Sequence, residues 1–170
     1  MTTSSHDHPH PHPRTDEATH DDWWRNVSTS ALLRAGFRSY GDVVRTALAE
    51  AGFDDLPRNG AYVVGATARG SLTIQQLPSA LGVTKQALSQ LLDALVLRGY
   101  VERAPDPRDR RRLLLTLTDR GVQVAELVEE CGRRTDAALV DIVGGTEALD
   151  TARRVLGAMT TIPADLLTAR

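Results

Sequence analysis

Residues 72–121 read LTIQQLPSALGVTKQALSQLLDALVLRGYVERAPDPRDRRRLLLTLTDRG, and this stretch decides the fold. A capping box begins at Thr73, where a glutamine follows the threonine three residues later, and it predicts a helix over 74–81. After a tight turn at a glycine, Thr84 is a good N-cap for a second helix that runs to about Arg98. The stretch therefore begins with a helix–turn–helix.

Two strand-like runs follow the second helix, over 100–104 and 112–117. They are joined by 105–111, a polar segment with two prolines, which is typical of the tip of a β-hairpin. A helix–turn–helix followed by a two-stranded hairpin is a winged helix.

Further helices flank this unit on both sides in the sequence. Apolar residues at steps of three and four predict a long helix over 24–51, and a second helix over 57–68 begins at a proline. Two more helices are expected over 119–143 and 147–160, with threonine N-caps at Thr118 and Thr146. We therefore expect a mainly α fold with a small β-hairpin wing (α+β), in which flanking dimerisation helices accompany a winged helix-turn-helix core.

Composition and charge restrict the class of protein. The chain has 170 residues, 41% of them hydrophobic and 25% charged, which is typical of a soluble globular protein. A single cysteine excludes an intrachain disulfide framework. The sequence has neither an apolar run long enough for a membrane helix nor a signal-peptide pattern, so we expect no membrane partner and a cytoplasmic location.

Positive charge is concentrated in one part of the chain. Residues 84–112 contain seven cationic and four acidic side chains, a net charge of +3 in a chain whose net charge is −2. A local basic region of this kind attracts nucleic acid even when the whole protein is slightly acidic. The second helix and the hairpin are therefore the candidate DNA-binding elements.

The second helix of the pair offers polar side chains on its solvent face. Lys85, Gln86, Ser89 and Gln90 lie in its first turns and have donors and acceptors that suit base edges in the major groove. Thr84 and the free backbone amides at the helix N-terminus suit a phosphate.

The hairpin tip adds arginines. Arg108, Arg110 and Arg111 suit the narrow minor groove, where the negative potential is strongest. We expect Asp109 to hold a neighbouring guanidinium in a fixed orientation. The alternative interpretation is that this run of charges is only a solvated turn.

The stretch 72–121 resembles the DNA-binding core of the multiple antibiotic resistance regulator (MarR) family. The resemblance is carried by Asp-Pro-Arg-Asp-Arg-Arg at 106–111 and Leu-Thr-Asp-Arg-Gly at 117–121, and it extends more weakly over about 30–165. It implies a homodimer with interleaved terminal helices and a transcriptional regulator, often a repressor that a ligand or oxidant relieves. It also implies minor-groove insertion of Arg110. Pro78 departs from the family pattern, and because proline lacks a backbone donor we expect the first helix of the pair to be short or bent.

Geometry independently favours a dimer. One small module contacts one half-site, and two modules about 34 Å apart reach successive major-groove faces of a palindromic operator in double-stranded DNA. We expect four segments: a disordered His/Pro-rich tail (1–22), an N-terminal dimerisation helix (23–56), a winged helix-turn-helix DNA-binding domain (57–118) and C-terminal dimerisation helices (119–170).

An effector site is weakly indicated. Arg38, Tyr40 and Tyr62 are candidates for a crevice between the first helices and the winged domain, and Trp24 is a candidate aromatic wall. An arginine beside aromatic rings suits a small aromatic or anionic effector. The alternative interpretation is structural, with the tryptophan buried at a dimer interface.

Metal and redox chemistry are less well supported. All five histidines lie in the first twenty residues, where they form either a chelating tail or a flexible one without a role. Cys131 is either a redox switch beside two arginines or a small hydrophobic residue of the core. We predict no metal site within the fold and no cofactor.

Two rival functions remain besides the DNA-binding regulator. The first is a winged-helix protein-interaction module without DNA binding, and the second is a metal-binding protein that acts through its histidine tail. We do not expect an enzyme, because the folded part has no histidine, no nucleophile–base pair and no phosphate-binding glycine loop.

Overall fold

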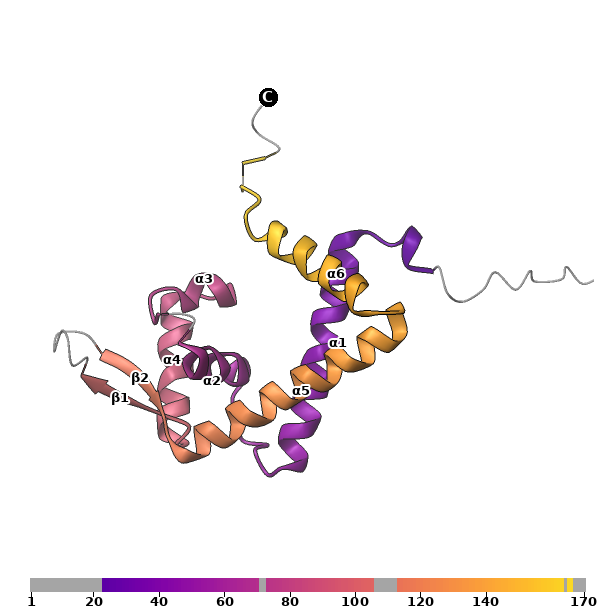
Figure 1. Ribbon diagram of the computed structural model, residues 1–170. Helices are drawn as coiled ribbons and strands as arrows, with labels where there is room; N and C mark the ends of the chain where they lie inside the picture. Colours follow the sequence, from indigo (N-terminus) through magenta and orange to yellow (C-terminus); the bar gives the residue numbers. More distant parts are fainter. Residues whose placement is uncertain (1–22, 71–72, 106–112, 164, 167–170) are drawn as a thin grey trace, which may run out of the picture. The chain divides into compact units, whose positions relative to one another are not determined.

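The computed structural model describes residues 23–70, 73–105, 113–163, 165 and 166 (Figure 1). Within these residues the chain forms a short 3₁₀ helix η1, six α-helices and one antiparallel hairpin, so the mainly α fold class with a small hairpin is confirmed. The elements are η1 (Trp23–Asn26), α1 (Thr29–Glu50), α2 (Gly60–Arg69), α3 (Leu77–Leu81), α4 (Lys85–Leu97), β1 (Val101–Pro105), β2 (Leu113–Leu117), α5 (Asp119–Val143) and α6 (Thr146–Met159).

The chain divides into two compact units, one up to Arg38 and the other from Ser39 onward. The described part of the first unit contains η1 and the N-terminal turns of α1. The second unit contains the rest of α1 and all the later elements. None of the helices that the structure describes has the length and apolar character that crossing a membrane requires.

The hydrophobic core of the second unit lies where α2, α4, α5 and the hairpin meet. Helix α2 packs against α5 and β2, and α4 packs against β1 and α3 (Figure 1). Burying one leucine-sized side chain contributes roughly 1.5–3 kcal/mol. The most deeply buried side chains are Val63, Val64, Leu95, Tyr100, Val101 and Val124.

The first two helices begin later than predicted. The tryptophans lie in η1, and α1 starts only at Thr29, where the Ser28 hydroxyl accepts a hydrogen bond from the Ala31 amide (3.3 Å). Helix α2 begins at Gly60 and not at 57, because Asn59 before it has a left-handed backbone (φ 67°) that cannot continue a helix.

Helix α3 is also shorter than the predicted 74–81. The side chain of Gln76 does reach back to Thr73, where its Oε1 accepts from both the backbone amide and the hydroxyl (2.9 Å each). Residues 74–76 nevertheless form a turn, and the helix begins at Leu77. Pro78 consequently falls in the first turn of the helix, where its missing donor has no cost.

Helix α4 follows the predicted course. Thr84 Oγ1 accepts from the amide of Ala87 (3.1 Å), and the chain leaves the helix through Gly99, whose φ of +69° favours glycine. Its buried face is centred on Leu88, Leu92 and Leu95. Ala87 and Val96 lie about 100° around the helix from this face and are exposed.

The hairpin begins one residue later than predicted, at Val101. The amide of Tyr100 is still bonded to the carbonyl of Leu95 (2.9 Å), so it belongs to the end of α4. The register pairs Val101 with Leu117 and Pro105 with Leu113. Arg112, the first residue of the predicted second strand, lies outside the described residues.

Helix α5 has its predicted bounds, and Thr118 Oγ1 caps it by accepting from the amide of Gly121 (3.1 Å). Helix α6 differs, because Thr146 is its first residue and Gly145 (φ +144°) occupies the capping position. The apolar stripe of α5 is covered at Val124 and Cys131, yet Ile142 near its end is 78% exposed. No residue of α6 is buried.

Candidate nucleic-acid interface

The exposed N-terminal end of α4 contains the five side chains that the sequence indicated for DNA binding, four for the major groove and Thr84 for a phosphate. Thr84 is the N-cap, and the other four occupy the first two turns of the helix. The four residues lie within about 8 Å along the axis, with Gln86 and Gln90 on the side opposite the buried leucines and Lys85 and Ser89 on its flanks. The exposed residues are Thr84, Lys85, Gln86, Ser89 and Gln90.

A tight connection fixes α4 relative to α3. Gly82 has a left-handed backbone (φ +63°), which lets the amide of Val83 bond to the carbonyl of Pro78 (3.0 Å). Leu77 of α3 is buried in the same core as Leu88 of α4. The two helices are therefore held by backbone geometry on one side and by apolar packing on the other.

The wing arginines lie outside the described residues, so no position is given for Arg108, Asp109, Arg110 and Arg111. The structure does place the strands from which this connection extends. Arg103 of β1 forms an ion pair with Asp93 of α4 (2.7 Å), which joins the strand to the helix. Both side chains are exposed, so the pair contributes at most about 1 kcal/mol to stability.

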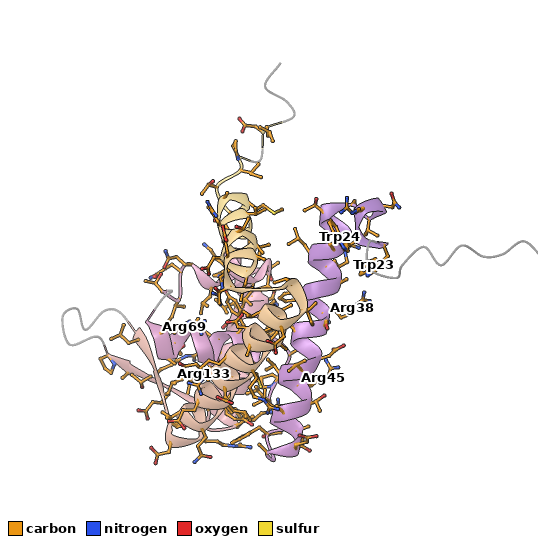
Figure 2. The ribbon with its side chains drawn as sticks, turned by 45° about the vertical axis from the view of Figure 1, so that its right-hand side comes forward. Trp23, Trp24, Arg38, Arg45, Arg69 and Arg133 are labelled. Atoms are coloured by element: carbon orange, nitrogen blue, oxygen red, sulfur yellow. The ribbon has the colours of Figure 1, made fainter. Side chains whose placement is uncertain are left out.

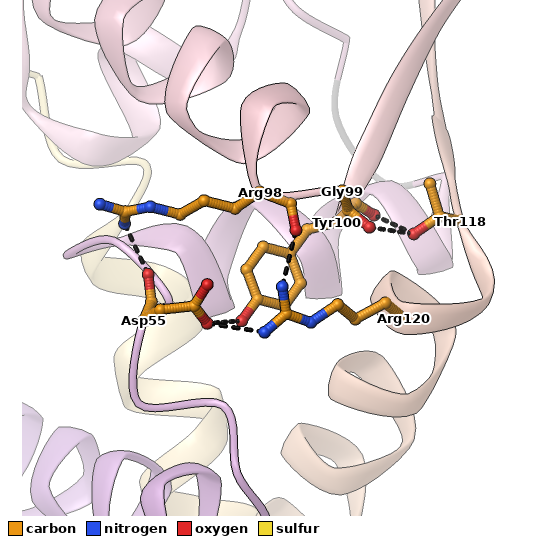
Figure 3. A network of polar contacts seen from close by, with 6 residues as sticks. All are labelled: Asp55, Arg98, Gly99, Tyr100, Thr118 and Arg120. Atoms are coloured by element: carbon orange, nitrogen blue, oxygen red, sulfur yellow. Dashed lines mark hydrogen bonds and ion pairs between the residues drawn. The ribbon is translucent and has the colours of Figure 1, made fainter.

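The two chain segments at the base of the wing are bonded to each other (Figure 3). The Thr118 hydroxyl donates to the carbonyl of Gly99 (2.6 Å), and the Thr118 amide donates to the carbonyl of Tyr100 (3.3 Å). Gly121 lies so close that a Cβ atom there would stand 2.0 Å from the Tyr100 oxygen. The Leu-Thr-Asp-Arg-Gly motif thus has a structural role, since its threonine caps α5 and its glycine lets α5 approach the backbone of Tyr100.

Beside this base lies a polar cluster that the sequence analysis did not identify, formed by Asp55, Arg98, Tyr100 and Arg120 (Figure 3). The carboxylate of Asp55 accepts hydrogen bonds from the Tyr100 hydroxyl and from Arg120 Nη2 (2.8 Å). Arg120 Nη1 donates to the carbonyl of Arg98 (2.7 Å). Arg98 Nη1 in turn donates to the backbone carbonyl of Asp55 (2.5 Å).

The cluster shifts the acidity of two of its members. The Tyr100 hydroxyl, and to a smaller extent Arg120, lowers the pKa of Asp55. Burial, and then the bond to Asp55, raises the pKa of Tyr100 to about 12. The carboxylate is therefore ionised and the phenol neutral at physiological pH. Sequence reasoning could not find this cluster because Asp55 is 65 residues from Arg120.

The candidate effector residues are divided between the two units. Trp24 and Arg38 lie in the first unit, where Figure 2 shows them in order along η1 and α1. The guanidinium of Arg25 stacks over the Trp24 ring (5.1 Å). Tyr40 and Tyr62 lie in the second unit, and each is 40% exposed. The Tyr40 hydroxyl faces Gly132 of α5.

The metal and redox candidates have different outcomes. Cys131 is buried in the core, as the structural interpretation expects. The histidine tail lies outside the described residues. Among the residues that are described, no cluster of histidine, cysteine or acidic side chains is arranged to hold a metal ion.

A pair of helices joined by a tight turn, α3 and α4, followed by a hairpin whose base is bonded to the next helix, defines a winged helix-turn-helix protein. Residues 54–112 match the sequence model of the MarR family. This match includes most of the stretch 72–121 and agrees with the resemblance seen in the sequence.

Two curated relatives illustrate the similarity. The chain is 38% identical over 65 residues to the multiple antibiotic resistance protein MarR of Salmonella typhimurium. The aligned residues cover 38% of this chain and 43% of the relative. It is 39% identical over 89 residues to the HTH-type transcriptional regulator PetP of Rhodobacter capsulatus, 52% of each chain. The chain thus spans about half or less of the length of the curated relatives it matches.

Solved structures share the fold over a larger part of the chain. MarR from E. coli in its reduced form gives a TM-score of 0.59 at 23% identity, covering 78% of this chain and 96% of that one. A mutant of the same protein complexed with operator DNA gives 0.58 at 22% identity, covering 80% and 96%. The likeness extends beyond the 54–112 segment and concerns the fold.

Proposed function

We propose that this chain is a sequence-specific DNA-binding transcriptional regulator. The observation that carries the proposal is the division of α4 into two faces, with three leucines in the core and five polar side chains exposed at the N-terminal end. The relatives give no support for an enzyme, and one of them, PetP, is named as a transcriptional regulator. A DNA partner agrees with a cytoplasmic location.

Helix α4 acts as the recognition helix in the major groove. Gln86 and Gln90 have the amide groups that bind adenine bidentately, and Ser89 between them reaches either donors or acceptors of the bases. Thr84 and Lys85 lie at the helix N-terminus, where free amides and a cation suit backbone phosphates.

The wing acts in the adjacent minor groove. Arg110 is the inserted side chain, Arg108 and Arg111 contact the backbone, and Asp109 orients a guanidinium, a proposal that rests on the sequence and the family. The Arg103–Asp93 ion pair supports it, since it joins the wing to the recognition helix.

The regulator acts as a homodimer on a palindromic operator. Large apolar side chains are exposed in the segments proposed for dimerisation, 23–56 and 119–170. Apolar patches of this kind mark interaction surfaces, and a two-fold dimer separates two recognition helices by one turn of DNA. The exposed side chains include Phe37, Leu139, Ile142, Val155, Leu156 and Ile162.

Repression relieved by a small ligand is the finer part of the proposal. The candidate contacts for an aromatic or anionic effector are Trp24, Arg38, Tyr40 and Tyr62, which combine exposed rings with a guanidinium. An effector should weaken operator binding, and the variants Trp24→Ala and Tyr62→Ala should bind DNA normally but respond less to that effector.

A salt titration of DNA binding tests the function. The full chain and Arg110→Ala are compared on DNA from the protein's own upstream region and on sites selected from random sequence. Each neutralised phosphate contributes about −0.9 to the slope of log K against log salt. A steep slope, a two-fold footprint and weaker binding by Arg110→Ala are expected. If no selected site binds at low salt, the proposal is wrong and a protein-interaction module takes its place.

A further inference from the structure

A small change in angle at the base of the wing is amplified at the far end of its strands. The chain enters the hairpin at Tyr100 and leaves it at Thr118, and the strands also pack against α2, α4 and α5. Five residues per strand extend about 17 Å, so a rotation of about 10° at the base would move the tip by about 3 Å. A displacement of that size exceeds the tolerance of a hydrogen bond.

Arg120 contacts three segments of the chain near this base. Its Nη1 donates to the carbonyl of Arg98 at the C-terminal end of α4 (2.7 Å), and its Nη2 donates to the carboxylate of Asp55 (2.8 Å). Its guanidinium also stacks over the Tyr100 ring, 4.3 Å from the centroid, and lies 5.9 Å from the ring of Phe53. One side chain from the first turn of α5 thus contacts the recognition helix, the wing entry and the loop after α1.

The contacts of Arg120 require the planar guanidinium. Two of its nitrogens donate in different directions while its face covers an aromatic ring, an arrangement that an ammonium group cannot reproduce. Asp55 links the members of the cluster: its carboxylate also accepts from the Tyr100 hydroxyl, and its backbone carbonyl accepts from Arg98.

We propose that Arg120, anchored by Asp55 and Tyr100, is a positioning residue that sets the angle of the recognition helix and the wing relative to α5. This inference rests on the proposed DNA-binding function. The cluster differs from an ordinary stabilising contact, because the side chains of Arg120 and Asp55 are 38% and 41% exposed. Exposed ion pairs contribute little to global stability. The directions of the hydrogen bonds of Arg120 still restrict the angle between α5 and the wing.

The same base holds three contacts that do not involve Arg120. Thr118 caps α5 and bonds to Gly99, and Gly121 packs against Tyr100. These contacts should keep the fold intact when Arg120 is changed, so the variant Arg120→Lys isolates the positioning role. Arg133→Lys is the matched control, since Arg133 lies on the same helix and pairs only with neighbouring glutamates, Glu129 and Glu130, in the described part of the chain.

The test combines hydrogen exchange with DNA binding, both on the full chain. In Arg120→Lys the backbone amides of β1 and β2 should exchange about tenfold faster, which corresponds to about 1.4 kcal/mol, while the core amides of α2 keep their rates. Affinity for a selected site should fall about tenfold, while affinity for random DNA changes less than twofold. Asp55→Asn should give the same pattern, and the double variant should be no worse than either single one.

The outcomes separate this inference from the proposed function. Unchanged exchange in the wing, or exchange that rises equally in α2 and the wing together with a lower Tm, would overturn the positioning role. If Arg133→Lys lost the same hydrogen-exchange protection and DNA affinity as Arg120→Lys, the positioning role would be overturned as well. A wild-type chain that binds no selected DNA would contradict the proposed function, and the exchange rates would still decide whether Arg120 holds the wing.

Discussion

The carbonyl oxygen of Tyr100 approaches Gly121 so closely that a Cβ atom at Gly121 would lie 2.0 Å from it. The contact brings the first turn of α5 against the start of the wing. Both partners belong to the backbone, so neither can move away as a flexible side chain could.

Replacing Gly121 by alanine should therefore destabilise the fold by about 3 kcal/mol or more, since the helix or the wing must shift to relieve the overlap. Gly41→Ala is the control, because the space around Gly41 in α1 is open. That change should stabilise the helix by about 0.5–1 kcal/mol. Urea denaturation measures both variants, and equal stability of Gly121→Ala and the wild type would contradict the close approach.

Thr118→Ala should cost about 2 kcal/mol, because it removes both the cap of α5 and a hydrogen bond to the Gly99 carbonyl. Thr84→Ala removes only a cap and should cost about 1 kcal/mol. Thr118→Ser keeps the hydroxyl and should retain most of the stability. The prediction is wrong if urea denaturation shows the two alanine variants to be equal.

Two exposed residues of α4, Lys85 and Gln90, should affect DNA binding in different ways. Lys85→Ala removes a phosphate contact, so it should weaken binding to all sequences and reduce the salt slope by about 1. Gln90→Ala removes a base contact, so it should cost about 1–3 kcal/mol on the selected site and little on random DNA. Fluorescence anisotropy at several salt concentrations measures both. A uniform loss for Gln90→Ala would exclude its role in base recognition.

Stability should fall between about pH 10 and pH 12 because of Tyr100. Its pKa is raised to about 12 in the folded chain, whereas an unfolded tyrosine ionises near 10. The bond from the neutral hydroxyl to Asp55 is thus fully present below about pH 10 and is lost as the pH rises through about 12. Urea denaturation across this range should show a steeper decline for the wild type than for Tyr100→Phe. Parallel curves would exclude the contribution of Tyr100.

Cys131 should be unreactive in the native protein, because it is only 6% exposed and lies in the hydrophobic core. A thiol reagent should modify it only in denaturant, and mild oxidation should leave operator binding unchanged. If the reagent modified Cys131 in the folded protein as fast as it modifies a free thiol in solution, the redox interpretation would be supported.

The elements that contain their own start and stop signals could be predicted from the sequence. Helix α4 has Thr84 before it and Gly99 after it, and α5 has Thr118 before it, so their bounds follow from local chemistry. The exposed polar end of α4 follows from helical periodicity in the same way. Where the start of a helix depended on contacts between residues far apart in the sequence, its predicted bounds were wrong.

Helix α2 is the clearest example of that difference. Pro57 suggested a helix start, but the left-handed Asn59 delays it to Gly60. A Cβ atom at Gly60 would lie 3.0–3.2 Å from Leu56 and Leu95, so this site is crowded by side chains, one of them from α4. Such packing is invisible to a local pattern, because Gly60 and Leu95 are far apart in the sequence.

The sequence by itself thus determined the winged helix-turn-helix class, the polar end of the recognition helix and the caps of α4 and α5, because each depends on residues within a few positions of one another. The tertiary structure alone decided that Asp55, Arg98, Tyr100 and Arg120 meet at the base of the wing. Hydrogen bonds and ring stacking act over a few ångströms, and only the folded chain brings a loop and a helix turn 65 residues apart to that distance.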